Sequence, residues 1–247
     1  MIITYANYHR WSKTVIPEDV FDGFGKKSKK RLLAAIPLIE SADIRTEVTP
    51  VNADFLAWFM PMYEARINSK ANPNVMPIEQ RIAESDKQFY ALQLFENEQP
   101  LGATIFSLPK ANFSIAWRTY ENSWAQTNFP INPSMYMEYI AAKVAIERGC
   151  KKLVHGKDSN PYGQNSSIGL AAFKFAVGSQ PSKCKVCEIQ TIDTDTVETD
   201  ILVFEYPEQD EKQIKKGYLV TSRENEPKWT QVTKYPHLVD IETIYRD

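Results

Sequence analysis

The chain has 247 residues, of which 43% are hydrophobic and 12% aromatic, with a formal net charge of −2 and an isoelectric point of about 6.0. This composition is sufficient for a folded core and excludes an intrinsically disordered chain. It also lacks the strongly basic balance that is typical of non-specific nucleic-acid binding. No apolar stretch is long enough to span a bilayer, and the first residues, MIITYANYHRW, lack a signal-peptide core. We therefore expect a cytoplasmic protein without a membrane partner.

The three cysteines are compatible with a reducing compartment. Cys184 and Cys187 form a single CxxC pair. A zinc site needs a second pair or histidines at suitable spacing, and the three histidines lie far away in sequence. We interpret the pair as structural thiols on a strand and expect no metal site.

The first third of the chain has mainly helical patterns. An aromatic cluster at Tyr5, Tyr8 and Trp11 is expected to cover the core. The basic run from Lys26 to Arg31 either binds phosphate or simply faces solvent at a helix start. The predicted elements are a strand at 1–5, a helix at 24–39 disturbed by Pro37, a strand at 44–51, a helix at 55–67 capped by Asn52 or Asp54 and kinked at Pro61, and a helix at 78–86.

The pattern then changes to the two-residue period of strands. Three antiparallel strands are predicted at 89–95, 101–108 and 113–119, joined by turns at 96–100 and 109–112. The next stretch, 132–178, predicts a helix, a strand, a polar loop and a second helix. Its elements are a buried helix capped by Asn132 and ended by Gly149, a strand at 153–155, a polar loop at 156–165, and a helix with Leu170, Phe173 and Val177 on one stripe. A polar loop after a buried strand is where open α/β sheets usually place their ligand.

The last part of the chain predicts a final antiparallel strand pair at 185–192 and 201–206. Beyond Pro207 the sequence becomes polar and charged, with one small hairpin predicted at 218–222 and 229–235. We interpret residues 207–247 as an appendage packed on a domain of residues 1–206, because about 40 residues rarely carry their own core. Strands, then helix–strand–helix, then more strands indicate a mixed α/β fold.

The run GLAAFKFAVG resembles the Fem-type branch of the GNAT-fold N-acyltransferases. The matching residues are Gly169, Leu170, Phe173, Lys174 and Gly178, and the basic run and the Trp58–Tyr63 helix are similar to the entry of that family. The resemblance covers roughly residues 24–206, and its motifs indicate the fold better than the substrate. It implies a mixed-sheet GNAT-like fold with a small C-terminal β appendage.

The same resemblance implies an activity. The chain would move an acyl or aminoacyl group from a thioester or ester donor to an amine of a small molecule, amino sugar or peptide. No cofactor would be permanently bound. Acyl-CoA is the expected co-substrate, ahead of aminoacyl-tRNA, which the acidic balance disfavours, and of a carrier-protein thioester.

Three residues are candidates for catalysis. His155 lies at the end of a predicted strand and could act as general base, or be a structural histidine. Asp158 could be the alternative base or orient His155, and it could equally cap its loop. Glu138 is the one acid in an apolar helix half, so it is either buried with a raised pKa or partly exposed.

Six further residues are candidates for substrate binding. Lys174 could meet a phosphate or carboxylate, or extend along the surface. The aromatic candidates could line an acceptor pocket or simply belong to the core. The set is Lys157, Asn160, Tyr162, Lys174, Trp117 and Tyr136.

One segment departs from the acyl-CoA-dependent pattern. Those enzymes carry a glycine-containing loop whose N–H groups hold a pyrophosphate, and residues 120–132 contain no glycine. The donor therefore stays open. Two alternatives to an enzyme are a non-catalytic GNAT-like binding module and a structural subunit that binds partners through surface aromatics.

Overall fold

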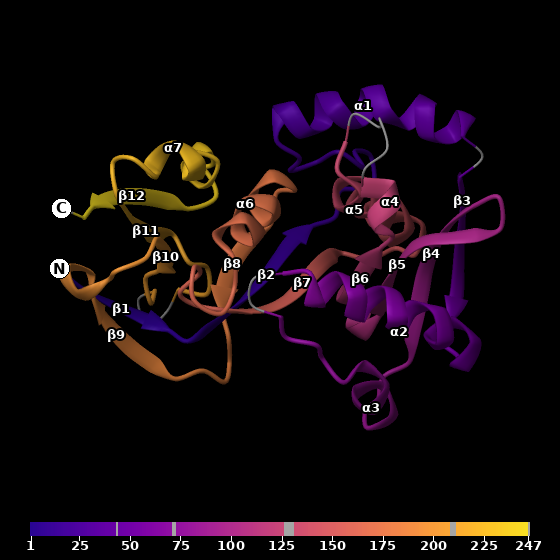
Figure 1. Ribbon diagram of the computed structural model, residues 1–247, viewed down its shortest axis with the longest axis horizontal. Helices are drawn as coiled ribbons and strands as arrows, with labels where there is room; N and C mark the ends of the chain where they lie inside the picture. The colour runs from indigo at the N-terminus through magenta and orange to yellow at the C-terminus, as the bar shows by residue number, and fades with distance from the viewer. Residues whose placement is uncertain (43, 71–72, 126–130, 208–210, 247) are drawn as a thin grey trace. The chain divides into compact units, whose positions relative to one another are not determined.

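The computed structural model describes residues 1–42, 44–70, 73–125, 131–207 and 211–246 (Figure 1). The chain divides into two compact units, one formed by Thr14–Val154 and the other by Met1–Lys13 with His155–Asp247. The division falls within one strand, β7 (Lys152–Ser159). The prediction of a boundary after residue 206 stays a prediction.

The Thr14–Val154 unit is a curled sheet with helices, and its strand order is β3-β4-β5-β6-β7. Neighbouring strands are antiparallel except for β6 and β7, which pair in parallel with Phe113 opposite Leu153. The elements of the unit are α1 (Lys26–Ser41), β3 (Ile44–Pro50), α2 (Ala53–Asn68), α3 (Ile78–Ala83), β4 (Phe89–Glu96), β5 (Gln99–Ser107), β6 (Asn112–Tyr120), α4 (Asn122–Ala125), α5 (Pro133–Glu147) and the start of β7.

Local chemistry explains these elements. The side chain of Asn52 accepts a hydrogen bond from the Phe55 N–H and caps α2, as predicted. Asn132 caps α5, and Pro133 occupies its first position, where no N–H is needed. Both α1 and α2 continue past their prolines, so the predicted interruption at Pro37 is wrong. Pro37 lies on the solvent side of α1, where water can satisfy the carbonyl that loses its partner.

The other unit contains two small sheets and three strands that belong to the seven-stranded sheet. Strands β7, β2 (Tyr8–Thr14) and β8 (Gln180–Lys183) are neighbours, β1 (Ile2–Ala6) pairs with β9 (Ile189–Asp193), and the second small sheet has the order β10-β11-β12. The remaining elements are α6 (Ile168–Ala176), β10 (Ile201–Phe204), β11 (Lys216–Thr221), α7 (Glu226–Trp229) and β12 (Asp240–Tyr245).

Two predicted strand pairings in this unit are wrong. Residues 189–193 pair with β1, and residues 201–204 pair with β11, so the predicted final hairpin does not form. The predicted hairpin at 218–222 and 229–235 is also absent, because β11 pairs in parallel with β12 and the segment between them forms α7 and a short 3-10 turn. The partner of β9 lies at the start of the chain, and the segments between β10, β11 and β12 are longer than a hairpin turn, so no turn residues mark these pairings.

A core of aromatic and aliphatic side chains fills this unit. Trp11, Phe175 and Phe204 are fully buried and their rings meet edge to face, with centroids 5.1–6.0 Å apart. Tyr235 stacks on Phe175 from the C-terminal segment. Across all the described residues, no helix is long and apolar enough to cross a membrane.

Candidate functional site

The site is built on β7, which is longer than predicted. His155 lies on the strand as predicted, and because the strand continues to Ser159, Lys157 and Asp158 also lie on it rather than in the polar loop expected at 156–165. Gly156 has a φ of 80°, a backbone conformation in which a side chain would be strained, and it lies between the two candidate bases. A strand holds side chains more rigidly than a loop, which suits a site that needs fixed geometry.

Helix α6 supplies the cation of the site. Ser167 caps the helix by accepting a hydrogen bond from the Leu170 N–H. The buried face of α6 carries Ala171, Lys174 and Phe175. The predicted stripe of Leu170, Phe173 and Val177 is therefore wrong, because Leu170 is exposed and Phe173 only half-buried.

Lys174 is buried although it is charged, with only 5% of its surface exposed. Its Nζ lies 2.6 Å from Asp158 Oδ2 and donates a second hydrogen bond, of 3.2 Å, to the carbonyl of His155. A buried ammonium needs a carboxylate and further acceptors to offset its lost hydration, and β7 provides both. The reading of Lys174 as an extended surface lysine is wrong.

Tyr162 connects this ion pair to the N-terminal strand β2. Its hydroxyl donates to Asp158 Oδ2 at 2.6 Å and accepts from Trp11 Nε1 at 2.7 Å. His9 Nε2 is 2.9 Å from the same hydroxyl. Burial raises the pKa of Tyr162 well above its ordinary value, and the nearby Asp158 carboxylate adds to the effect. The tyrosine therefore stays protonated and keeps donating to Asp158.

The hydrogen-bond inventory determines the tautomer of His9. The single proton of the Tyr162 hydroxyl goes to Asp158, so His9 Nε2 must carry a proton and donate it to the hydroxyl oxygen. Nδ1 is then a bare acceptor, and it has no hydrogen-bond partner among the described residues. Burial lowers the pKa of His9 to about 3, so the ring is neutral at pH 7.

His155 contacts the end of α6 through its side chain. Its Nδ1 is 2.7 Å from the hydroxyl of Ser179, which is fully buried just after the helix. The hydrogen bond holds the plane of the imidazole ring. The structure thus brings His155, Asp158, Tyr162 and Lys174 together, as the sequence interpretation expected of this stretch.

Two predicted binding residues serve other contacts. Asn160 is buried, and its amide donates to the carbonyls of Ala6 and Phe204 and accepts from the Phe204 N–H. Both polar atoms of its side chain thus hold backbone, and Asn160 also lines the pocket described below, so the binding role predicted for it stays a prediction. Lys157 is exposed, and its Nζ lies 3.9 Å from the centre of the Tyr8 ring.

The remaining three candidates belong to the Thr14–Val154 unit. Glu138 is completely buried, so the partly exposed reading is wrong, and its Oε2 pairs with Arg118 at 3.1 Å. Tyr136 is buried against Trp124, and burial raises its pKa to about 12. Trp117 is half-buried and packs on Phe89. The roles predicted for these residues stay predictions.

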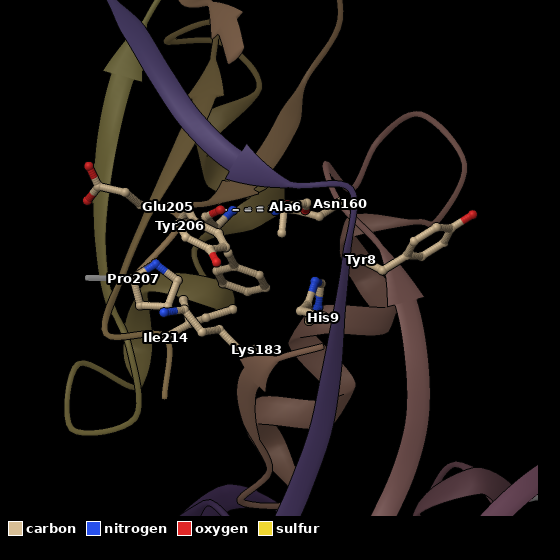
Figure 2. Close-up of a pocket in the computed structure, with 10 residues that line it drawn as sticks. Ala6, Tyr8, His9, Asn160, Lys183, Glu205, Tyr206, Pro207 and Ile214 are labelled. Carbon is tan, nitrogen blue, oxygen red and sulfur yellow. Dashed lines mark hydrogen bonds between the residues drawn. The ribbon is translucent and has the colours of Figure 1, made fainter. Parts of the chain in front are cut away.

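A small pocket lies beside the network, on the side of β2 where His9 projects (Figure 2). Tyr8, the preceding residue, points away from it, as the alternation of side chains along a strand requires. Phe204 and Ile214 provide an apolar wall. Lys183 lies at the rim with its Nζ 4.8 Å from the Tyr206 ring centre.

Sequence reasoning missed three members of the network, namely His9, Trp11 and Ser179. In β2, residues 9, 11 and 13 are buried and their neighbours are not. This two-residue alternation in YHRWSKT was the available signal for a strand, whereas Tyr5, Tyr8 and Trp11 were interpreted only as an aromatic cluster that covers the core. No sequence pattern marks Ser179, which is placed only by folding.

The CxxC pair lies in the bend between β8 and β9, not on a strand as predicted. Both thiols are free, and Cys187 Sγ lies 3.6 Å from the Cys184 carbonyl. Among the described residues no group of three or more His, Cys, Asp or Glu side chains is arranged to hold a metal ion.

Comparison with known proteins identifies the fold. No family model and no curated protein sequence matches the chain. FemX is similar in structure, with 12% identity and a TM-score of 0.50 over 71% of this chain and 59% of FemX. The chain has a GNAT-like fold.

Two further structures are similar over shorter or looser alignments. They are L-PGS from Bacillus licheniformis, with 14% identity and a TM-score of 0.43 over 63% of this chain and 48% of that one, and a GCN5-related N-acetyltransferase-like protein from Streptococcus suis, with 9% identity and a TM-score of 0.37 over 77% of this chain and 61% of that one. This chain spans less than two thirds of each of the three proteins. At these identities the likeness establishes the fold and assigns no residue a role.

Proposed function

We propose that the chain is an N-acyltransferase that joins an acyl or aminoacyl group to a primary amine. The observation that carries the proposal is the buried Lys174–Asp158 ion pair, 2.6 Å long, within a GNAT-like fold. Lys174 belongs to the Phe-Lys pair that resembles the Fem-type pattern. Burying an ion pair is costly, so a chain that keeps one beside a histidine and a tyrosine has a use for the charge.

Acyl transfer to an amine requires few catalytic groups from the protein. The amine nitrogen attacks the carbonyl carbon of the donor, a C–N bond forms, and the C–S bond of a thioester or the C–O bond of an ester breaks. Negative charge develops on the carbonyl oxygen before the leaving group departs, and a fixed cation nearby lowers that barrier. Lys174 would supply this charge, held in place by Asp158 and by the carbonyl of His155.

The amine must also lose a proton. His155 would accept it on its imidazole ring, which the contact between Nδ1 and Ser179 holds in place. Asp158 is already engaged, because Lys174 and Tyr162 both donate to the same carboxylate oxygen. We therefore assign Asp158 to positioning Lys174, and His155 to proton transfer.

Acyl-CoA is the proposed donor, followed by aminoacyl-tRNA and carrier-protein thioesters, and amino sugars, amino acids or peptides are the proposed acceptors. The glycine-free segment 120–132 lies partly outside the described residues, so its contribution to donor binding is a proposal only.

The first test is the melting temperature with coenzyme A, acetyl-CoA and an aminoacyl-tRNA. A ligand at about a hundred times its dissociation constant adds about 2.7 kcal/mol to the free energy of unfolding. We expect a shift with one donor class and transfer of its acyl group to at least one amine, followed by mass spectrometry. Binding without transfer would favour the non-catalytic GNAT-like module.

A further inference from the structure

Helix α1 carries the basic run that the proposed chemistry does not use. Five cations lie between Lys26 and Arg31, at the end of the helix where the macrodipole is positive. The first turn contains no acidic residue, and Gly25 provides no side-chain cap. Cations at this end destabilise a helix, so the run is not explained by the stability of α1.

Four of these cations have no partner within the described part of the chain. Lys29 pairs with Asp19 at 3.8 Å and lies over the Phe21 ring, in front of the helix. The other four are exposed and make no hydrogen bond or ion pair with any described residue. They are Lys26, Lys27, Lys30 and Arg31.

The same helix face exposes large apolar side chains. Leu33 and Leu38 are each 51% exposed, while Leu32, Ala35 and Ile39 form the buried face. Helix α1 packs on α5 through that buried face (Figure 1). This face of α1 therefore combines half-exposed leucines with unpaired cations, and a binding partner for it would offer both an apolar layer and negative charge.

Helical spacing places the two kinds of side chain in register. Positions i, i+4, i+7 and i+11 fall on one line along a helix. One solvent-facing line contains Lys26, Lys30, Leu33 and Pro37, and the next contains Lys27, Arg31, Ala34 and Leu38. Each line begins with two cations and ends with apolar residues.

We propose that this face of α1 binds the surface of a membrane that contains anionic phospholipids. The cations would meet lipid phosphates, and Leu33 and Leu38 would enter the boundary between headgroups and acyl chains. Nucleic acid would also attract the cations, but it has no apolar layer to receive exposed leucines. The sequence expectation of no membrane partner rested on the lack of a spanning segment, and a helix lying on a bilayer needs none.

The test uses the full chain and sedimentation with vesicles of phosphatidylcholine alone or mixed with phosphatidylglycerol. We expect binding to the anionic vesicles only, and release at high salt because screening weakens surface charges. Lys26→Gln with Lys30→Gln should weaken partitioning by about tenfold or more. Lys151→Gln with Lys152→Gln, which removes the same charge from other exposed lysines, should leave it within about twofold.

A second pair of variants separates lipid from nucleic acid. Leu33→Ser with Leu38→Ser keeps every charge and should weaken vesicle binding by about tenfold, whereas the exposed Val186→Ser should not. Each variant is first shown to melt like the wild type. Absence of binding to anionic vesicles would overturn the proposal. A second result would also overturn it. In that result the protein binds a fluorescent RNA but no vesicles, the lysine variant loses the RNA binding, and the leucine variant keeps it.

Discussion

Lys174 on α6 and Asp158 on β7 form an ion pair of 2.6 Å in which both side chains are more than 90% buried. The pair joins a helix to a strand sixteen residues earlier in the chain. Tyr162 donates to the same carboxylate oxygen and extends the pair into a network that reaches β2. The network therefore connects segments that are distant in sequence, and it concentrates the polar atoms of an otherwise apolar core.

Removing either partner of this pair should be strongly destabilising. Lys174→Met leaves a buried carboxylate and Asp158→Asn leaves a buried ammonium, and each should lower the free energy of unfolding by about 3–5 kcal/mol. The measurement is urea denaturation. Lys215→Met is the control, because Lys215 pairs with Glu211 on the surface and its loss should cost no more than about 0.5 kcal/mol. Equal effects at the two sites would show that the buried pair is not formed.

The hydroxyl of Tyr162 should matter as much as its ring. Tyr162→Phe removes one donor to Asp158 and leaves the buried N–H groups of Trp11 and His9 without an acceptor. Each unsatisfied buried group costs about 1–3 kcal/mol, so a total loss above about 3 kcal/mol is expected in the same denaturation assay. Tyr8→Phe, at an exposed position, should be neutral. A neutral Tyr162→Phe variant would mean that the network does not exist in solution.

Stability should fall in acid because of His9. The pKa of His9 is about 3 in the folded chain, against an ordinary value of 6.5. Below pH 6.5 His9 therefore becomes protonated in the unfolded chain but stays neutral in the folded chain, which favours unfolding. The stabilising contribution is complete above pH 6.5 and is lost as the pH falls toward 3. Between pH 6.5 and 4.5 the loss is about 2 kcal/mol. His9→Gln should remove this share of the pH dependence, and an unchanged profile would contradict the burial of His9.

The core face of α6 is tested by two phenylalanines two residues apart. Phe175 is fully buried among Trp11, Phe204 and Tyr235, so Phe175→Ala should cost about 3–5 kcal/mol. Phe173 is half-buried, and the same truncation there should cost clearly less. Melting of the two variants side by side provides the comparison. The sequence stripe led to the opposite expectation, with Phe173 in the core.

That reversal illustrates what the sequence could and could not reveal. Helix α5 and strands β4–β6 follow from caps and periodicity that act within a few residues, and they were predicted nearly to their ends. The partners of β9, β10 and β11 were not, because β9 pairs with the start of the chain and the other two pairings lack the tight turn that marks a hairpin. The β7–α6 part of the site could be anticipated from the polar residues after Val154. His9 could not, since its place beside Tyr162 depends on an N-terminal strand 153 residues away.

The burial of Lys174 had a different cause. Lysine is almost never fully buried, so sequence reasoning assigns it to the surface. Here the carboxylate of Asp158 and the carbonyl of His155 replace its hydration, and both are supplied by β7. The face of α6 that is buried is therefore the one that carries Lys174 toward Asp158, not the predicted stripe of Leu170, Phe173 and Val177.

Acyl transfer itself is the central claim, and steady-state kinetics with the donor found by thermal shift test it most directly. Wild type, His155→Ala and Ser179→Ala are compared across pH. We expect His155→Ala to remain folded and to lower kcat by about 10²–10⁴-fold, with loss of the limb of the pH–rate profile that a titrating general base produces. Ser179→Ala should give a smaller decrease, because it only releases the ring. A folded wild type that transfers no acyl group from any donor class, or a His155→Ala variant with unchanged kcat and pH profile, would contradict the account.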